Sequence, residues 1–164
     1  MSKPGQWNQP ASRPTVLIVD DEVGIRKLLT AILDENGYLA DTAENGYEAI
    51  RKTDEKFYNI VLIDIVLPDM NGVELLTKIK ETKPKIRKII MTGNPSLQNA
   101  VEALNKGADA YIMKPLDIEK ILATIKEQLE KQRKEWETAT EHFARGRLRG
   151  RIDVLSRENS ERTI

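Results

Sequence analysis

The chain alternates short apolar runs with longer segments in which apolar residues recur every three or four positions. Runs such as Val16-Leu17-Ile18-Val19 and Ile60-Val61-Leu62-Ile63 are typical of strands buried on both faces of a parallel sheet. The pattern predicts strands at 15–19, 38–42, 59–64, 87–91 and 109–112. It predicts helices at 24–35, 45–54, 72–81 and 96–106, and a last helix from 117. This order predicts an α/β fold with a five-stranded, doubly wound parallel sheet.

Local signals place several element boundaries. The second strand begins Tyr38-Leu39-Ala40 and is the least apolar, so we expect it at an edge of the sheet. Asn36-Gly37 and Lys106-Gly107 supply the left-handed turn that ends many helices. Asp117 can accept the free amide hydrogens at the start of the last helix.

The last helix is unusually long. Apolar residues spaced by seven continue through it, at Leu122, Leu129, Trp136 and Phe143. A helix over 117–144 would be about 42 Å long, against about 17 to 20 Å for a typical strand, so its second half cannot rest on the sheet. We expect Arg145-Gly146 to end it. The remainder should be loosely ordered, with at most a short helix around Leu148, Ile152 and Leu155.

Length and charge suggest one domain with tails. The 164 residues divide into a disordered N-terminal extension (1–14), one domain (15–130), and a helical extension with a basic, loosely ordered tail (131–164). Lys plus Arg and Asp plus Glu number 26 each, but residues 144–164 hold six Arg against three acids, a net charge of +3 (6 − 3). The chain has no cysteine, which excludes disulfides and thiolate sites. No apolar stretch approaches the roughly 20 residues that span a bilayer, so we expect a cytoplasmic protein with no membrane partner.

Acidic residues follow two of the predicted strands. Asp20 and Asp21 come after the first strand, and Asp64 ends the third. Ligands bind outside the carboxyl ends of parallel strands, where the strand order reverses, so three carboxylates should meet there. Two unit charges about 4 Å apart repel by about 4 kcal/mol at an effective dielectric of about 20, so the cluster favours a cation. Mg²⁺ (or Mn²⁺) suits it, because Mg²⁺ binds a few carboxylates and keeps waters or phosphate oxygens.

Two further strand ends carry polar groups. The fourth ends at Met91-Thr92-Gly93, and the fifth at Tyr111-Ile112-Met113-Lys114-Pro115. Carboxylates, a hydroxyl and an ammonium group together suit the transfer of a phosphoryl group onto a carboxylate.

These motifs resemble the receiver domain of two-component response regulators over about residues 15–130. The resemblance is carried by Asp20-Asp21, by Asp64 before Leu-Pro-Asp-Met-Asn-Gly, by Thr92-Gly93 and by Lys114-Pro115. It implies a stand-alone or single-domain regulator with a flavodoxin-like sheet of strand order 2-1-3-4-5 and an extended C-terminal helix.

The resemblance also implies roles for individual residues. Asp64 would accept phosphate from a histidine kinase or a phosphotransfer protein. Asp21, Asp64 and the backbone carbonyl of Val66 would bind Mg²⁺, with Asp20 acting mainly through water. Lys114 would contact the phosphoryl group through a cis peptide to Pro115. Thr92 and Tyr111 would form the switch, and a downstream protein target would sense it.

Two other functions fit the same residues. The protein could be a transcription regulator that uses its basic tail, or a magnesium-dependent phosphatase that forms an aspartyl phosphate on Asp64. The lack of a second carboxylate at Val66 argues against the phosphatase, so we expect catalysis limited to the protein's own phosphorylation and dephosphorylation. For the tail we rank a homodimer through Trp136 and Phe143 above nucleic-acid binding, because Gly146 and Gly150 disrupt a rigid recognition helix.

Overall fold

The five strands form one parallel sheet in the order β2-β1-β3-β4-β5, which confirms the predicted topology and the edge position of the second strand. The computed structural model describes residues 12–93 and 96–161. The strands are β1 (Thr15–Val19), β2 (Leu39–Ala43), β3 (Ile60–Asp64), β4 (Arg87–Thr92) and β5 (Ala110–Met113). The helices are α1 (Val23–Glu35), α2 (Gly46–Glu55), α3 (Gly72–Lys78), α4 (Leu97–Asn105) and α5 (Ile118–Glu161).

Helices cover both faces of the sheet, because successive side chains of a strand point to opposite sides. Leu17 and Val19 of β1 pack in the core layer beneath α2, α3 and α4. Val16 and Ile18 pack in the other layer, against α1 and α5. β1 and β3 are therefore buried on both faces, as their unbroken apolar runs predict.

Three predicted helix boundaries are confirmed by their capping geometry. Gly37 and Gly107 have positive φ angles of 87° and 106°, the left-handed conformation that glycine adopts without strain. Asp117 accepts hydrogen bonds from the backbone N–H of Glu119 and Lys120 at 3.1 and 3.4 Å. These contacts terminate α1 and α4 and start α5.

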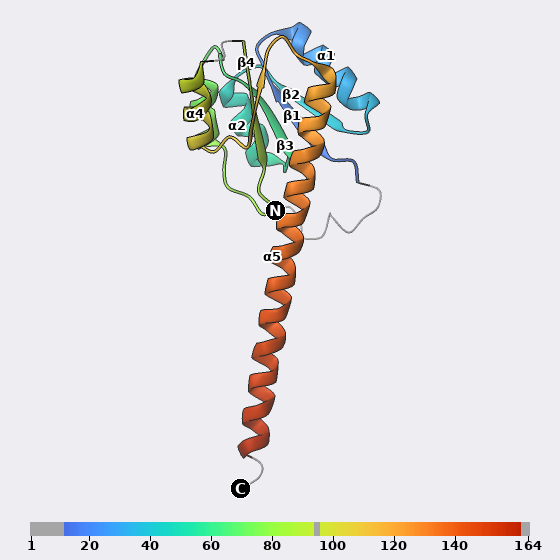
Figure 1. The fold of residues 1–164 in the computed structure, drawn as a ribbon, viewed down its shortest axis with the longest axis vertical. Coiled ribbons are helices and arrows are strands. Elements are labelled where there is room, and N and C mark those ends of the chain that lie inside the picture. Colours follow the sequence, from blue (N-terminus) through green and yellow to red (C-terminus); the bar gives the residue numbers. More distant parts are fainter. Residues whose placement is uncertain (1–11, 94–95, 162–164) are drawn as a thin grey trace.

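The predicted end of α5 at Arg145-Gly146 is wrong, because the helix continues to Glu161 (Figure 1). Neither Gly146 nor Gly150 has the positive φ of a helix-ending glycine. A glycine inside a helix costs about 1 kcal/mol relative to alanine but does not break it, whereas proline would. The expectation of a loosely ordered tail with one short helix is therefore replaced, through residue 161, by a continuous helix that extends well beyond the domain (Figure 1).

Two smaller differences concern α3 and the N-terminal extension. α3 ends at Lys78 rather than 81, since Ile79 turns to extended backbone and buries its side chain in the core. The predicted disorder of 1–14 falls mostly outside the described residues. Within them, Arg13 donates hydrogen bonds to the carbonyl oxygens of Gly37 and Tyr38 at 3.2 and 3.0 Å, so residues just before β1 pack on the domain.

A polar network holds α5 against the amino-terminal edge of the sheet. The Gln132 side chain is buried and donates hydrogen bonds to the carbonyl oxygens of Asn59 and Lys85 at 3.0 and 2.8 Å. It also accepts one from the Asn59 side chain at 3.1 Å. Arg87 pairs with Asp109 at 3.2 Å and with Glu135 of α5 at 2.6 Å. The helix is thus fixed to the sheet as far as residue 135.

No helix in the described part of the chain combines the length and the apolar character needed to cross a membrane.

Candidate functional site

Three carboxylates meet at the carboxyl edge of the sheet, between β1 and β3. Each of Asp20, Asp21 and Asp64 offers an oxygen, and these oxygens lie within 4.8 Å of one another. The strand order reverses between these two strands, which is where open α/β sheets bind ligands. Asp20 and Asp64 are buried, and Asp21 is exposed. The grouping predicted from the two acidic strand ends is therefore present.

Lys114, which follows β5, completes the cluster. Its Nζ lies 3.1 Å from Asp20 Oδ2 and 3.5 Å from Asp64 Oδ2. Its backbone N–H donates to the carbonyl oxygen of Thr92 at 2.7 Å, and its peptide bond to Pro115 is cis. Three carboxylates and one ammonium group leave a formal charge of −2 (−3 + 1), which a divalent cation would neutralise.

The electrostatics of the cluster follow from burial and from its own charges. Burial raises the pKa of the Asp64 carboxyl, and the negative charge of Asp20 adds to this, against the lowering effect of Lys114. Burial opposes the charged form of Lys114, but the carboxylates of Asp20 and Asp64 outweigh it and raise the pKa of the ammonium group. Asp64 is thus a carboxylate whose charge is poorly solvated and only partly compensated.

The loop after Asp64 is shaped by Asn71 and Gly72. Asn71 accepts a hydrogen bond from the Val73 N–H at 2.8 Å and so caps α3. A Cβ at Gly72 would lie 2.4 Å from the carbonyl oxygen of Asp64, closer than any real contact. Only glycine lets α3 begin this close to the strand end. Val66, in the same loop, exposes 71% of its surface and donates its N–H to Asp64 Oδ1 at 3.4 Å.

Thr92 and Tyr111 lie on the neighbouring strands. Thr92 is fully buried at the end of β4, one residue after Met91, which is the register partner of Asp64. The Tyr111 ring packs against the core layer beneath α2, α3 and α4. Its hydroxyl oxygen is buried and makes no hydrogen bond to the described residues.

Two residues that support the site were missed by the sequence analysis. Arg26 of α1 donates to the carbonyl oxygen of Asp20 at 2.8 Å and pairs with Glu44 at 3.2 Å. Asp69 accepts the N–H groups of Gly46 and Tyr47, both at 2.9 Å, and so ties the loop after β3 to the start of α2. Each of these contacts joins separate elements or loops, so no periodic pattern marks them.

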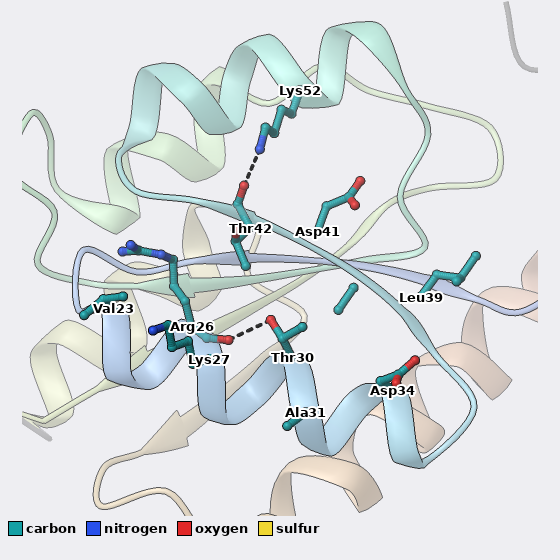
Figure 2. A pocket seen from close by; sticks show the side chains of 11 residues that line it. Val23, Arg26, Lys27, Thr30, Ala31, Asp34, Leu39, Asp41, Thr42 and Lys52 are labelled. Carbon is teal, nitrogen blue, oxygen red and sulfur yellow. Dashed lines mark hydrogen bonds between the residues drawn. The ribbon is translucent and has the colours of Figure 1, made fainter.

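A separate groove runs between α1 and the edge strand β2 (Figure 2). None of the three clustered carboxylates lines it. Figure 2 shows Lys52 of α2 donating to the carbonyl oxygen of Thr42, which covers part of the open edge of the sheet. The groove is therefore distinct from the acidic site.

Comparison with known proteins identifies the family. Residues 16–126 match the model of the response regulator receiver domain. The chain belongs to this family. It is a receiver domain of the two-component type, whose members are phosphorylated on an aspartate. The resemblance inferred from the strand-end motifs is confirmed.

Individual relatives give the extent of the likeness of this receiver domain. The transcriptional regulatory protein ZraR of Klebsiella oxytoca is 42% identical over 114 residues, which cover 70% of this chain and 26% of that protein. The chain thus spans about a quarter of the length of this relative.

Among solved structures, the receiver domain resembles a CheY-like response regulator receiver domain protein from Methanospirillum hungatei JF-1. The two are 45% identical with a TM-score of 0.72, over 76% of this chain and 99% of that one. The beryllofluoride-activated NtrC4 receiver domain, solved as a dimer, is 42% identical with a TM-score of 0.68, over 72% of this chain and 98% of that one.

Proposed function

We propose that Asp64 is the residue that accepts the phosphoryl group, from a histidine kinase or a phosphotransfer protein. The observation that carries this is the cluster of three carboxylates within 4.8 Å, with Lys114 in contact with two of them. An oxygen of Asp64 forms the bond to phosphorus while the bond from phosphorus to the donor's histidine nitrogen breaks, and the released imidazole takes up a proton. Asp64 suits this role because it ends β3 at the carboxyl edge of the sheet, with Lys114 Nζ 3.5 Å from its carboxylate.

The donor set fits a hard divalent cation such as Mg²⁺. Asp21, Asp64 and the backbone carbonyl of Val66 would hold it, with Asp20 acting through water. When bound, the cation supplies positive charge that neutralises phosphoryl oxygens. Lys114 supplies a second positive charge from the carboxyl end of β5, at the same edge of the sheet.

Thr92 and Tyr111 change their contacts when Asp64 is phosphorylated. The Thr92 hydroxyl donates to a phosphoryl oxygen, and Tyr111 repacks within the core behind it. A shift from 1:99 to 99:1 in favour of the active state needs about 5.5 kcal/mol, more than one hydroxyl contact provides. Lys114, the cation and Tyr111 therefore have to contribute together.

A downstream protein reads the switch on the surface of α4, β5 and α5. Val101, Leu104 and Met113 expose 49%, 53% and 47% of their surfaces there. Catalysis is limited to the protein's own phosphorylation and dephosphorylation, in line with a family of signalling domains. Val66 provides no second carboxylate for a phosphatase.

Intact-mass analysis tests this proposal. Incubation of the protein with Mg²⁺ and acetyl phosphate should add one phosphoryl group, and Asp64→Asn should abolish the addition. Asp54→Asn, which changes an exposed carboxylate at the end of α2, should leave it unchanged. Addition to the Asp64→Asn variant, or no addition to the wild type with Mg²⁺, would refute the role of Asp64.

A further inference from the structure

The free segment of α5, residues 137–161, is exposed at every position from 137 to 160 and carries several large apolar side chains. Beyond the last contacts with the domain, at Gln132 and Glu135, five large apolar side chains each expose more than half of their surface. They are Phe143 at 64%, Leu148, Ile152 and Leu155 at 60% each, and Val154 at 55%. This segment has no packing against the domain, as its exposure and Figure 1 show.

These side chains fall on two different faces of the helix. Ile125 packs against the sheet, and Phe143 follows it by about five full turns, so Phe143 points to the domain side. Ile152 follows Ile125 by about seven and a half turns and points to the opposite side. Leu148 and Leu155 lie four residues before and three residues after Ile152, on the same face. We call Leu148, Ile152 and Leu155 the outward stripe.

Position on the helix decides which face a second copy can reach. Pairing through Trp136 and Phe143, as the heptad spacing suggested, would place the domain itself between two parallel helices. Nearer to the domain, the outward face of the helix is charged: Arg133 pairs with Glu137 at 2.7 Å and also with Glu130. The outward stripe is therefore the accessible apolar surface of the free segment.

The free segment is also a poor helix by itself. It contains Gly146 and Gly150, each of which costs about 1 kcal/mol relative to alanine. Most helical stability in proteins comes from packing of an apolar face, which the free segment lacks within one chain. A continuous helix here calls for a partner on the outward stripe.

We propose that the outward stripe binds the outward stripe of a second copy of this chain, in an antiparallel two-stranded coiled coil. The 4-then-3 spacing of Leu148, Ile152 and Leu155 is that of coiled-coil core positions. Antiparallel pairing stacks Ile152 on Leu155 of the second copy, twice by symmetry. It also leaves the two domains at opposite ends of the pair, where they do not collide.

Charge selects the antiparallel orientation. Arg145, Arg147, Arg149 and Arg151 form a block without any acid between them, while Asp153, Glu158 and Glu161 follow it. A parallel pair would bring the two arginine blocks together. The antiparallel pair instead brings Arg151 beside Glu158 of the second copy, at positions flanking the core, where salt bridges set orientation. This interaction does not depend on phosphorylation of Asp64.

Sedimentation velocity of the full chain over a range of concentrations tests the interface. We expect a monomer–dimer equilibrium that Ile152→Asn weakens at least tenfold. Val154→Asn is the matched control, because Val154 is equally β-branched and similarly exposed but lies off the stripe. It should leave the dissociation constant unchanged.

A charge exchange tests the orientation. Arg151→Glu should weaken association, and the double variant Arg151→Glu with Glu158→Arg should restore it. The proposal is overturned by a monomer at all concentrations, by equal effects of the two asparagine substitutions, or by a double variant that stays weak. Binding of monomeric protein through this segment to duplex DNA or to phosphatidylglycerol vesicles would likewise overturn it.

Discussion

Val66 lies two residues after Asp64 and is the most exposed of the large apolar side chains described. An aliphatic side chain cannot orient a water for attack on a phosphoryl group at Asp64. We predict that Val66→Asn shortens the phosphoryl lifetime roughly tenfold, below the usual range for a positioned proton-transfer group because an amide only orients the water. The decay of phosphorylated wild type and variant, followed by intact mass, checks this. Equal or slower loss from the variant would show that Val66 does not protect the phosphoryl group.

Tyr58 and Asp41 give a second prediction, which depends on pH. The buried Tyr58 hydroxyl donates to Asp41 at 2.7 Å and is the main cause of the lowered pKa of that carboxyl. Tyr58→Phe should cost about 1 kcal/mol of folding free energy at neutral pH, below the usual range of about 1.5 to 3 kcal/mol for a bond to a charged group, because the Asp41 side chain is partly exposed. A lowered folded-state pKa stabilises the protein above the unfolded pKa of about 3.9, and this stabilisation is lost as the pH falls through the folded value.

Chemical denaturation of Tyr58→Phe at several pH values measures this effect. The difference from wild type should be full near pH 7 and shrink below about pH 4. Tyr47→Phe, at an exposed tyrosine, should have no effect at either pH. If the difference in unfolding free energy between Tyr58→Phe and wild type does not change with pH, the charge of Asp41 is not its cause.

Sequence reasoning succeeded at residues whose position depends only on their own strand. Asp20, Asp64 and Lys114 each follow an apolar run, and a parallel sheet brings such positions to one edge. Arg26 and Asp69 could not be found this way, because their roles depend on how separate elements pack. Neither contact leaves a periodic signal in the chain.

At the scale of elements, polar contacts anchor α5 to the sheet. Gln132→Ala would leave the buried side-chain amide of Asn59 without its acceptor and would remove the hydrogen bonds to the carbonyl oxygens of Asn59 and Lys85. We predict a loss of about 2 kcal/mol in the free energy of unfolding, within the range for unsatisfied buried groups. Gln128→Ala is the control, since this equally buried glutamine makes a single hydrogen bond of 3.4 Å. Similar losses from both variants in urea denaturation would contradict a special role for Gln132.

The rule that a glycine ends a helix holds at some positions of this chain and fails at others. Gly37 and Gly107 ended helices as predicted, because tertiary packing turns the chain back toward the sheet after each. Gly146 did not, because no packing of the domain demands a turn there. Whether a glycine ends a helix therefore depends on the packing of the next segment as much as on its own flexibility.

At the scale of the whole molecule, we predict that the acidic cluster makes the stability of the protein depend on Mg²⁺. The cation should raise the melting temperature, since binding to the folded state alone adds about 2.7 kcal/mol at 100 times the dissociation constant. The order of stability of the wild type and Asp21→Asn should depend on Mg²⁺. Without Mg²⁺ it should be at least as stable as wild type, because one repelling charge is gone, and with Mg²⁺ it should be less stable.

Calorimetry with Mg²⁺, and with Na⁺ at matched ionic strength, checks this rank reversal. If Mg²⁺ raises the melting temperatures of the wild type and of Asp21→Asn by the same amount, the cation does not bind at Asp21.

The free segment of α5 separates the end of the helix from the domain by a large distance. From residue 135 to residue 161, a straight helix extends about 40 Å at 1.5 Å per residue. In the paired state proposed above, a fluorophore attached near residue 160 would lie far from its own folded domain and would be joined to it by a supported helix anchored at Gln132. Small rotations of that anchor would be magnified into large excursions of the dye, so energy transfer to a second dye on α1 would make a sensitive gauge of helix tilt.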